Sequence, residues 1–316
     1  MTVIDVHTHH TRRGYIHESW WRSIGYVVQR ELRRRGRPMT LEEATDYFLT
    51  RAEARCGDAM IESMDIAGID RMVVFPLDFG QTMPEPEIPI EQQNEETAEL
   101  CARHPDRLIF FAAVDPLRGE RALWLFQRMV TEFGAKGLKL HPLAGFYPNQ
   151  GEVYPFYERC VEFAIPVLIH SGIDPPPVRN KYGQPIHLDD VCTDFPHLRV
   201  MCAHMGGVWR DEAVTLSLYH PNLWLDLSGT QTFLQRDAIG FYKRLRSDVD
   251  LLGPDKICFA SDYPYYGSEK ALKGWVEALC SPLPEVAEAG ITFSKEELEG
   301  ILHRNAEAWL GMQPPG

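Results

Sequence analysis

Short apolar runs alternate with longer amphipathic stretches along most of the chain. The apolar runs have the length and composition of buried strands, and helical patterning separates each run from the next. They begin at Val3, Met72, Leu108, Gly137, Pro166, Arg199, Leu223 and Ile257. Eight alternating units predict an α/β fold, a closed parallel (β/α)8 TIM barrel. An open doubly wound sheet is the alternative, but no GxGxxG follows the first run and that fold needs fewer units.

Helical patterning gives the approximate bounds of the intervening segments. The spacing of apolar positions predicts helices at about 57–67, 90–103, 121–133, 154–163, 188–195, 211–219, 233–249, 270–280 and 295–309. No linker interrupts the series. We therefore expect one domain over residues 1–316.

A segment at about 15–55 interrupts the alternation directly after the first strand. It is helical in pattern, contains aromatic residues such as Trp20 and Trp21, and has a helix start signal at Thr40 followed by two glutamates. We predict a helical insertion. Its position after the first strand favours an active-site lid, and a helix pair used for packing or dimerisation is the alternative.

Several predicted strands end in side chains that bind metals or carry protons. The first ends in His7 and His9, which are two residues apart and so share one face of the strand. The other such residues are Lys139 and His141 on the fourth strand, His170 on the fifth, His204 on the sixth and Asp262 on the eighth. Each has an ordinary structural explanation when taken alone, as a hydrogen-bonded core histidine, a snorkelling lysine or a capping aspartate. Because the C-terminal ends of barrel strands meet at one mouth, their joint placement predicts a divalent metal site there.

Charge and cysteine content limit the other classes of function. The formal net charge is −13, which argues against nucleic acid or an anionic membrane as a partner. A local run of arginines at 30–37 is interpreted as a solvated helix face. The seven cysteines are scattered without a CxxC pair, so we expect neither disulfides nor a thiolate zinc site. With no signal-peptide pattern and no apolar run of membrane-spanning length, we expect a cytoplasmic protein.

Five ordered motifs carry a resemblance to a known family. They are IDVHTH at 4–9, KGLKLHP at 136–142, VLIHSG at 167–172, AHMGG at 203–207 and ASDYP at 260–264. Together they resemble the amidohydrolase superfamily, and more narrowly its amidohydrolase-related branch of metal-dependent hydrolases and aminocarboxymuconate-semialdehyde and resorcylate decarboxylases. The resemblance implies that one divalent metal ion, zinc in preference to manganese, is bound by His7, His9, His170 and Asp262. His204 would lie beside the metal as an acid, base or polarising group.

The resemblance leaves the role of Lys139 open. In binuclear members of the superfamily a carbamylated lysine on the fourth strand bridges two metals, and a second metal held by Lys139, His170 and His204 is the alternative here. We favour one metal, with Lys139 and His141 facing the cavity to bind substrate.

For the reaction, we expect hydrolysis of an ester, lactone or amide of a small cyclic or aromatic carboxylic acid. Metal-activated water would attack, Asp262 would take the proton, and His204 would assist the leaving group. The alternatives are a metal-dependent decarboxylase of an aromatic or dienoic acid, a metal-free lactonase-like relative and a non-enzymatic binding protein.

A homo-oligomer is possible, with the helical insertion as a candidate dimerisation element. The substrate is expected to be a small anion. Tyr263 is expected to bind substrate together with Lys139 and His141. Further candidates by position are Arg12, Arg13 and Arg179 for a carboxylate, and Trp20, Trp21 and Tyr147 for an apolar wall.

Overall fold

The computed structural model describes residues 1–312, and its strands form a parallel sheet. Neighbouring strands pair in the orders β1-β2-β3 and β4-β5-β6-β7-β8-β9, every pair being parallel. The strands are β1 (Ile4–His9), β2 (Arg71–Phe75), β3 (Leu108–Phe110), β4 (Ala112–Ala113), β5 (Leu138–Leu140), β6 (Val167–Ile169), β7 (Val200–Cys202), β8 (Leu223–Asp226) and β9 (Ile257–Cys258). β3 and β4 flank Phe111, whose backbone N–H donates to Val74 at 3.0 Å, so they occupy one barrel position. The eight predicted strand positions are thus confirmed.

The first and last strands are joined by backbone hydrogen bonds. The N–H of Val6 donates to the carbonyl of Phe259 at 3.2 Å, and the N–H of Asp262 donates to the carbonyl of His7 at 2.8 Å. A further bond runs from the N–H of His9 to the carbonyl of Tyr263 at 2.7 Å. These bonds complete the ring of strands, and they also fix the two chain segments that carry the predicted metal ligands beside each other.

Side chains fill the inside of the ring, as expected for a barrel of eight strands. The interior cluster includes Val6, Phe75, Phe111 and Met201, and Trp309 from the last helix is fully buried within it. A second, larger cluster lies between the outer faces of the strands and the surrounding helices. The packed interior leaves the strand ends as the place where a site can form.

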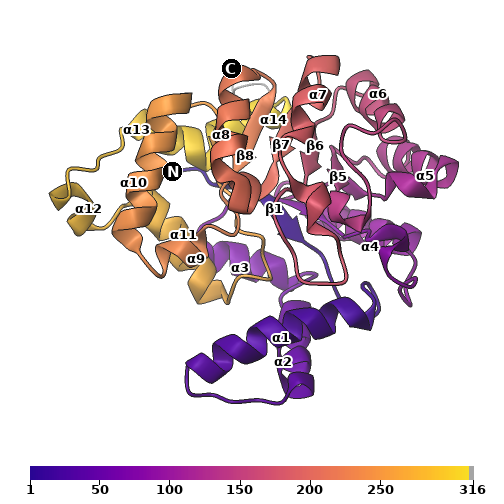
Figure 1. Cartoon of the computed structure of the whole chain (residues 1–316), viewed down its shortest axis with the longest axis horizontal. Coiled ribbons are helices and arrows are strands. Elements are labelled where there is room, and N and C mark those ends of the chain that lie inside the picture. Colours follow the sequence, from indigo (N-terminus) through magenta and orange to yellow (C-terminus); the bar gives the residue numbers. More distant parts are fainter. Residues whose placement is uncertain (313–316) are drawn as a thin grey trace.

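Helices cover the outside of the barrel (Figure 1). They are α3 (Ala59–Ala67), α4 (Ile90–Arg103), α5 (Glu120–Thr131), α6 (Tyr154–Glu162), α7 (His187–Asp194), α8 (Arg210–Tyr219), α9 (Gln231–Leu234), α10 (Ala238–Leu252), α11 (Glu269–Cys280), α12 (Pro284–Glu288), α13 (Lys295–Glu299) and α14 (Asn305–Leu310). Most agree with the predicted ranges within two residues.

Two predicted helices are divided in the structure. The segment predicted at 233–249 separates into α9 and α10. Asp237 has a non-helical backbone (φ −150°, ψ 87°), and its side chain accepts a hydrogen bond from the N–H of Gly240, capping a new helix. The segment predicted at 295–309 contains a π-helical turn at Gly300–Arg304 between α13 and α14. At Gly300 a β-carbon would lie 2.3 Å from the carbonyl oxygen of Pro254, so close approach to the preceding loop accompanies the distortion.

The segment after β1 contains two helices, α1 (Glu18–Arg34) and α2 (Leu41–Glu53), which pack against each other. Thr40 and Glu43 form a reciprocal capping box at the start of α2, as the sequence indicates. Figure 1 shows the pair projecting from one side of the barrel. The inner residues Trp20 and Trp21 of α1 are buried, so the pair is anchored to the barrel through aromatic side chains.

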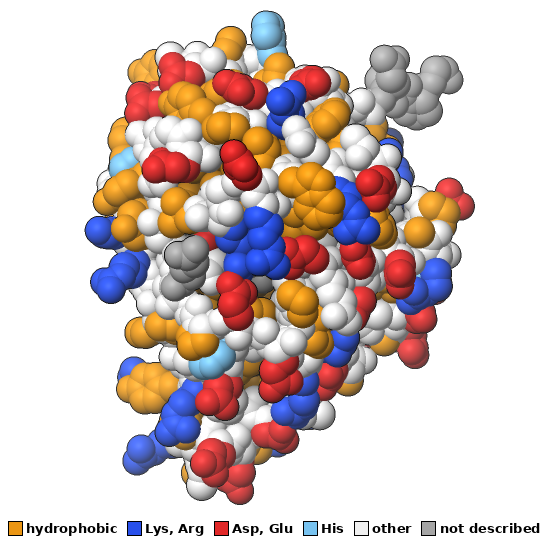
Figure 2. All heavy atoms as spheres, turned by 90° about the vertical axis from the view of Figure 1, so that its right-hand side faces the viewer, with side chains coloured by type: hydrophobic (Ala, Val, Ile, Leu, Met, Phe, Trp, Pro, Cys, Tyr) orange, Lys and Arg blue, Asp and Glu red, His pale blue; other side chains and the backbone are white. Residues whose placement is uncertain are grey.

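The surface carries charges of both signs. On the face shown in Figure 2, acidic and basic side chains are interspersed, with apolar side chains scattered between them. Within residues 1–312, none of the helices combines the length and apolar character that crossing a bilayer would need.

Candidate metal centre and cleft

The two histidines of β1 converge with Asp262 at the barrel mouth. Nε2 of His9 lies 2.7 Å from Oδ1 of Asp262, and Nε2 of His7 lies 3.6 Å from the same oxygen. All three residues are buried. Asp262 has a φ of +56°, an uncommon conformation for a residue other than glycine, and its N–H is held by the carbonyl of His7. The turn after β9 is therefore shaped to aim this carboxylate at the β1 histidines.

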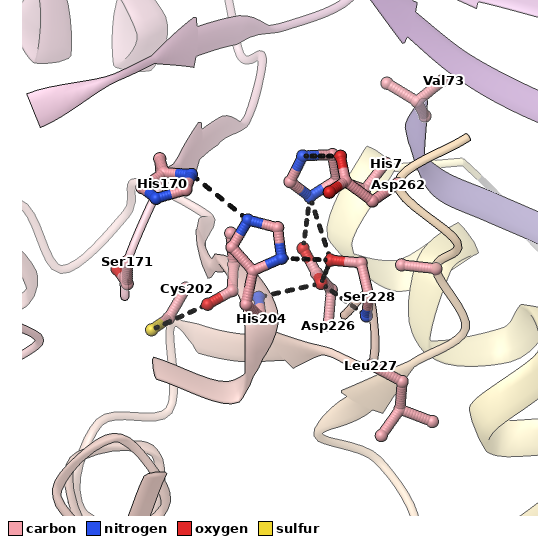
Figure 3. Close-up of polar contacts among 12 residues, drawn as sticks. His7, Val73, His170, Ser171, Cys202, His204, Asp226, Leu227, Ser228 and Asp262 are labelled. Carbon is pink, nitrogen blue, oxygen red and sulfur yellow. Dashed lines mark hydrogen bonds and ion pairs between the residues drawn. The ribbon is translucent and has the colours of Figure 1, made fainter. Parts of the chain in front are cut away.

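Asp226 at the end of β8 holds His7 from the other side, a role that our strand-end analysis missed. Its Oδ2 lies 2.9 Å from Nδ1 of His7, and its Oδ1 accepts the backbone N–H groups of His204 and Ser228 at 3.0 Å each. Figure 3 shows this carboxylate linked both to the ring of His7 and to the backbone of His204. A carboxylate ending a predicted strand was the available signal, and the same rule that selected Asp262 would have selected Asp226.

His204 and His170 form a second pair of imidazoles beside this centre. Nε2 of His204 lies 3.2 Å from Nδ1 of His170, and Nδ1 of His204 lies 2.8 Å from the hydroxyl of Ser228 (Figure 3). His204 and the following Met205 have φ values of 57° and 52°. This left-handed turn after β7 directs the His204 ring back toward the barrel axis.

Lys139 and His141 on β5 extend the cluster. The ammonium group of Lys139 lies 3.2 Å from Nε2 of His7 and over the ring of Phe75. Nε2 of His141 lies 3.2 Å from Oδ2 of Asp174, a residue of the β6 loop that the sequence analysis did not single out. The structure thus brings Lys139 into the centre, and places His141 against Asp174.

Burial sets the charge states of these groups. It is the largest cause of the pKa values of His7, His9 and His170 falling well below the usual range for histidine. It also raises the pKa of Asp262 to about 6 and lowers the pKa of Lys139 to about 7. The imidazoles are therefore neutral at physiological pH, the form that binds metal ions.

The donor atoms fit a divalent cation. Within the described residues, three groups place one ligand atom from each member within 4.8 Å of the others: His7, His9 and Asp262; His7, His204 and Asp226; and His141, His170 and Asp174. Three of the predicted ligands are thus in one group, and His170 falls in another. Nε2 of His170 is buried and has no hydrogen-bond partner among the described residues, which is costly unless a ligand satisfies it. The set of imidazoles and carboxylates suits zinc or manganese.

A cleft of about 290 Å³ opens beside the cluster. His170, Asp174, His204 and Asp262 line the side next to the candidate metal centre, and the remaining lining comes mainly from the loops after β6, β7 and β8 and from α10. The volume is of the order of a small-ligand pocket. The cleft can admit a substituted aromatic ring beside the candidate metal centre.

Other residues proposed from the sequence lie elsewhere. The hydroxyl of Tyr263 lies 2.8 Å from that of Ser63 on α3, and Tyr266 lines the cleft instead. Arg12 pairs with Glu96 and Arg13 with Asp46, Arg179 is exposed, and Tyr147 packs on Tyr182 and His187.

Trp20 and Trp21 pack against Tyr265, which in turn packs against His9 of the candidate metal centre. Their rings lie 5.9 and 6.3 Å from that of Tyr265. The Tyr265 ring in turn lies 4.9 Å from the ring of His9. The helix pair after β1 therefore contributes an apolar wall behind the β1 histidines.

Comparisons with known proteins agree with this architecture. The sequence model of the family described as Amidohydrolase matches residues 4–312. A gamma-resorcylate decarboxylase of Rhizobium radiobacter is 23% identical over 270 residues, 70% of this chain and 80% of that protein. The uncharacterized TIM-barrel protein Bb4693 of Bordetella bronchiseptica superposes with a TM-score of 0.69 at 22% identity, covering 98% of this chain and 100% of that one.

A second solved structure is that of 5-carboxyvanillate decarboxylase of Novosphingobium aromaticivorans, complexed with manganese and 4-hydroxy-3-methoxy-5-nitrobenzoic acid. It superposes with a TM-score of 0.66 at 19% identity and covers 98% of this chain and 96% of that one. At such identities the structural likeness establishes the fold, a TIM barrel.

The relatives correct the expected reaction. We expected a hydrolase, and the curated relatives are named as decarboxylases. The expectation rested on the KLHP segment around Lys139 and His141. Neither Lys139 nor His141 lines the cleft, so this segment is a poor guide to what happens to a bound substrate. The candidate metal ligands are equally compatible with both reactions.

Proposed function

The chain belongs to the amidohydrolase family, and on that premise we propose that it is a metal-dependent decarboxylase of an aromatic acid. The observation that carries the proposal is the buried group of His7, His9 and Asp262 beside a cleft of aromatic-acid size, in a chain whose curated relatives are gamma-resorcylate decarboxylases. The metal-free and purely binding alternatives do not account for the cluster of buried, neutral imidazoles.

His7, His9 and Asp262 would hold the metal, with His170 as a further ligand from the cleft wall. We propose manganese as the first ion to test, because a structural neighbour is described with it, and zinc as the second, because imidazole donors suit it. When bound, the cation supplies positive charge that attracts the carboxylate and hydroxyl oxygens of the substrate.

The chemistry requires a proton at the ring carbon that carries the carboxylate. The C–C bond then breaks, its electron pair restores the aromatic ring, and carbon dioxide leaves. Among residues 1–312, four imidazole or carboxylate side chains line the cleft: His170, Asp174, His204 and Asp262. Because His170 is proposed as a metal ligand and Asp174 is hydrogen-bonded to His141, we assign the proton transfer to Asp262 and His204. The Ser228 hydroxyl contacts Nδ1 of His204, and the Asp226 carboxylate accepts the backbone N–H of His204, so both keep this residue in place.

Incubation of the manganese-loaded protein with 2,6-dihydroxybenzoate (gamma-resorcylate) and other 2-hydroxybenzoates is expected to release carbon dioxide and form the corresponding phenol. Benzoate is the control, because without a hydroxyl group the protonated ring is poorly stabilised. Exhaustive chelation should abolish the release, and added manganese should restore it. Release that persists after chelation would contradict the metal-dependent proposal, as would its absence from all 2-hydroxybenzoates.

Gly229 offers a test of the cleft itself. Its φ is +78°, and a β-carbon there would lie 3.6 Å from Nδ1 of His204 and 3.7 Å from the hydroxyl of Tyr266. We expect Gly229→Ala to lower kcat/KM by about tenfold, because the added methyl group takes up space in the cleft beside His204, where the substrate would bind. Gly290→Ala is the matched control, because Gly290 has a φ of +75° and no neighbouring atom within 4 Å of the added carbon. Equal kcat/KM losses in the two variants would remove Gly229 from the substrate site.

A further inference from the structure

Two arginines line the cleft that contains His204 and Asp262. Arg210 begins α8 and Arg244 lies on α10. The guanidinium of Arg210 is buried and forms an ion pair with the carboxylate of Asp248, which is itself largely buried. The charge of Arg210 is therefore balanced within the protein.

Within residues 1–312, Arg244 has no hydrogen-bonded carboxylate partner, although its charge also acts on Asp248, which is already paired with Arg210. Nη2 of Arg244 lies 3.8 Å from Oδ1 of Asp211, too far for a hydrogen bond. The Asp211 side chain is 92% exposed and that of Arg244 is 51% exposed. Such a solvated pair neutralises little charge. Arg244 thus presents a cation to the cleft at a solvent-exposed position, while Asp174 and Asp262 line the cleft next to the candidate metal centre.

The remaining lining of the cleft suits a flat apolar group. Phe233 and Val208 contribute apolar surface, and Tyr266 contributes its ring. Gly229 has no side chain, so the backbone can be approached closely between His204 and Tyr266. An aromatic ring placed here would have one edge toward the metal centre and the opposite side toward Arg244.

We propose that Arg244 binds a second carboxylate of the substrate, so that aromatic dicarboxylates are preferred over monocarboxylates such as 2,6-dihydroxybenzoate. The guanidinium fork matches a carboxylate in geometry and charge. The inference rests on the proposed decarboxylase function, in which the carboxylate at the metal centre is lost and the one at Arg244 is retained. Arg244 then acts as a specificity-determining residue that sets the orientation of the ring.

The test is a binding measurement, which does not depend on turnover. Isothermal titration calorimetry on the manganese-supplied full chain compares benzoate with benzene-1,3-dicarboxylate and benzene-1,4-dicarboxylate. We expect at least one dicarboxylate to bind about tenfold more tightly than benzoate, as a charged hydrogen-bonded contact allows, and this preference to weaken as ionic strength rises.

Arg244→Gln is expected to remove the preference for the dicarboxylate while changing the affinity for benzoate by less than about twofold. Lys243→Gln is the matched control, because Lys243 is the exposed neighbouring cation on α10 and does not line the cleft. The Lys243→Gln variant should retain the preference for the dicarboxylate over benzoate. Equal affinities of the wild type for benzoate and both dicarboxylates would overturn the inference, and so would an unchanged preference in Arg244→Gln.

Failure of the decarboxylase proposal and failure of the Arg244 assignment give different experimental results. If no aromatic acid releases carbon dioxide but the Arg244-dependent preference remains, the decarboxylase proposal is wrong and the binding of a carboxylate by Arg244 is supported. If carbon dioxide is released from monocarboxylates and the preference is absent, the decarboxylase proposal stands and the assignment of Arg244 is wrong.

Discussion

Replacing Asp262 by asparagine is expected to lower kcat for decarboxylation by about a thousandfold, within the range for loss of a general acid or base. The carboxylate oxygen lies 2.7 Å from Nε2 of His9 and 3.6 Å from Nε2 of His7. An asparagine keeps the shape but is neutral and carries no transferable proton. Bound metal per chain should also fall, because one of the three grouped ligands is lost. Turnover and elemental analysis measure the two effects.

Asp255→Asn is the matched control for charge, because Asp255 is exposed in the loop before β9. It should keep both turnover and metal content. A folded Asp262→Asn protein with near wild-type kcat would remove Asp262 from the reaction and contradict the assigned centre.

The second large effect is expected for Asp226→Asn, through the tautomer of His7. Asp226 accepts the Nδ1 proton of His7 at 2.9 Å, which leaves Nε2 unprotonated and directed toward Asp262. An asparagine that keeps its oxygen on the N–H groups of His204 and Ser228 turns its NH₂ toward His7. The proton of His7 then moves to Nε2, which can no longer bind a metal. We expect metal affinity to fall by about 10- to 100-fold, as for other partners of metal-binding histidines.

Ser228→Ala separates this effect from general disturbance of the loop. It removes the hydroxyl bonded to Asp226 and His204, together with its longer contact of 3.3 Å to Nδ1 of His7. The 2.9 Å contact between Asp226 and His7 remains. The loss of metal affinity in Ser228→Ala, followed by competition with a chelator of known affinity, should be smaller. If Asp226→Asn binds metal as tightly as the wild type, the tautomer of His7 is not set by Asp226.

The sequence was sufficient to predict the barrel because each strand is buried on both faces and is separated from the next by an amphipathic helix. The divisions within the last helices were not predictable from periodicity. They depend on local polar contacts, such as the Asp237 cap, and on the close approach of Gly300 to Pro254, which leave the apolar pattern nearly unchanged.

The centre was only partly predictable. Strand-end positions identified His7, His9 and Asp262, which the structure brings together. Periodicity could not show that Asp174 joins His141 and His170 in another group, because Asp174 comes from the loop after β6. Tyr263 follows Asp262 in the chain, but the turn sends its hydroxyl to Ser63 on α3.

The reaction was the least predictable property. Metal ligands determine what can be polarised, and the same ligands serve hydrolysis and decarboxylation. The choice between hydrolysis and decarboxylation depends on the cleft. Its lining residues come from separate segments, such as Gly229 from the loop after β8, Phe233 from α9 and Arg244 from α10. No single sequence motif contains them.

The most direct test of the central claim follows isotopes during turnover of the manganese-loaded protein. With 2,6-dihydroxybenzoate in D₂O, decarboxylation predicts carbon dioxide and a resorcinol carrying one deuterium at the carbon that lost the carboxylate, resolved by NMR against resorcinol incubated alone. With esters or lactones of aromatic acids in H₂¹⁸O, it predicts no enzyme-dependent ¹⁸O in the product acid. Enzyme-dependent ¹⁸O incorporation, without deuterated resorcinol or carbon dioxide, would contradict the account.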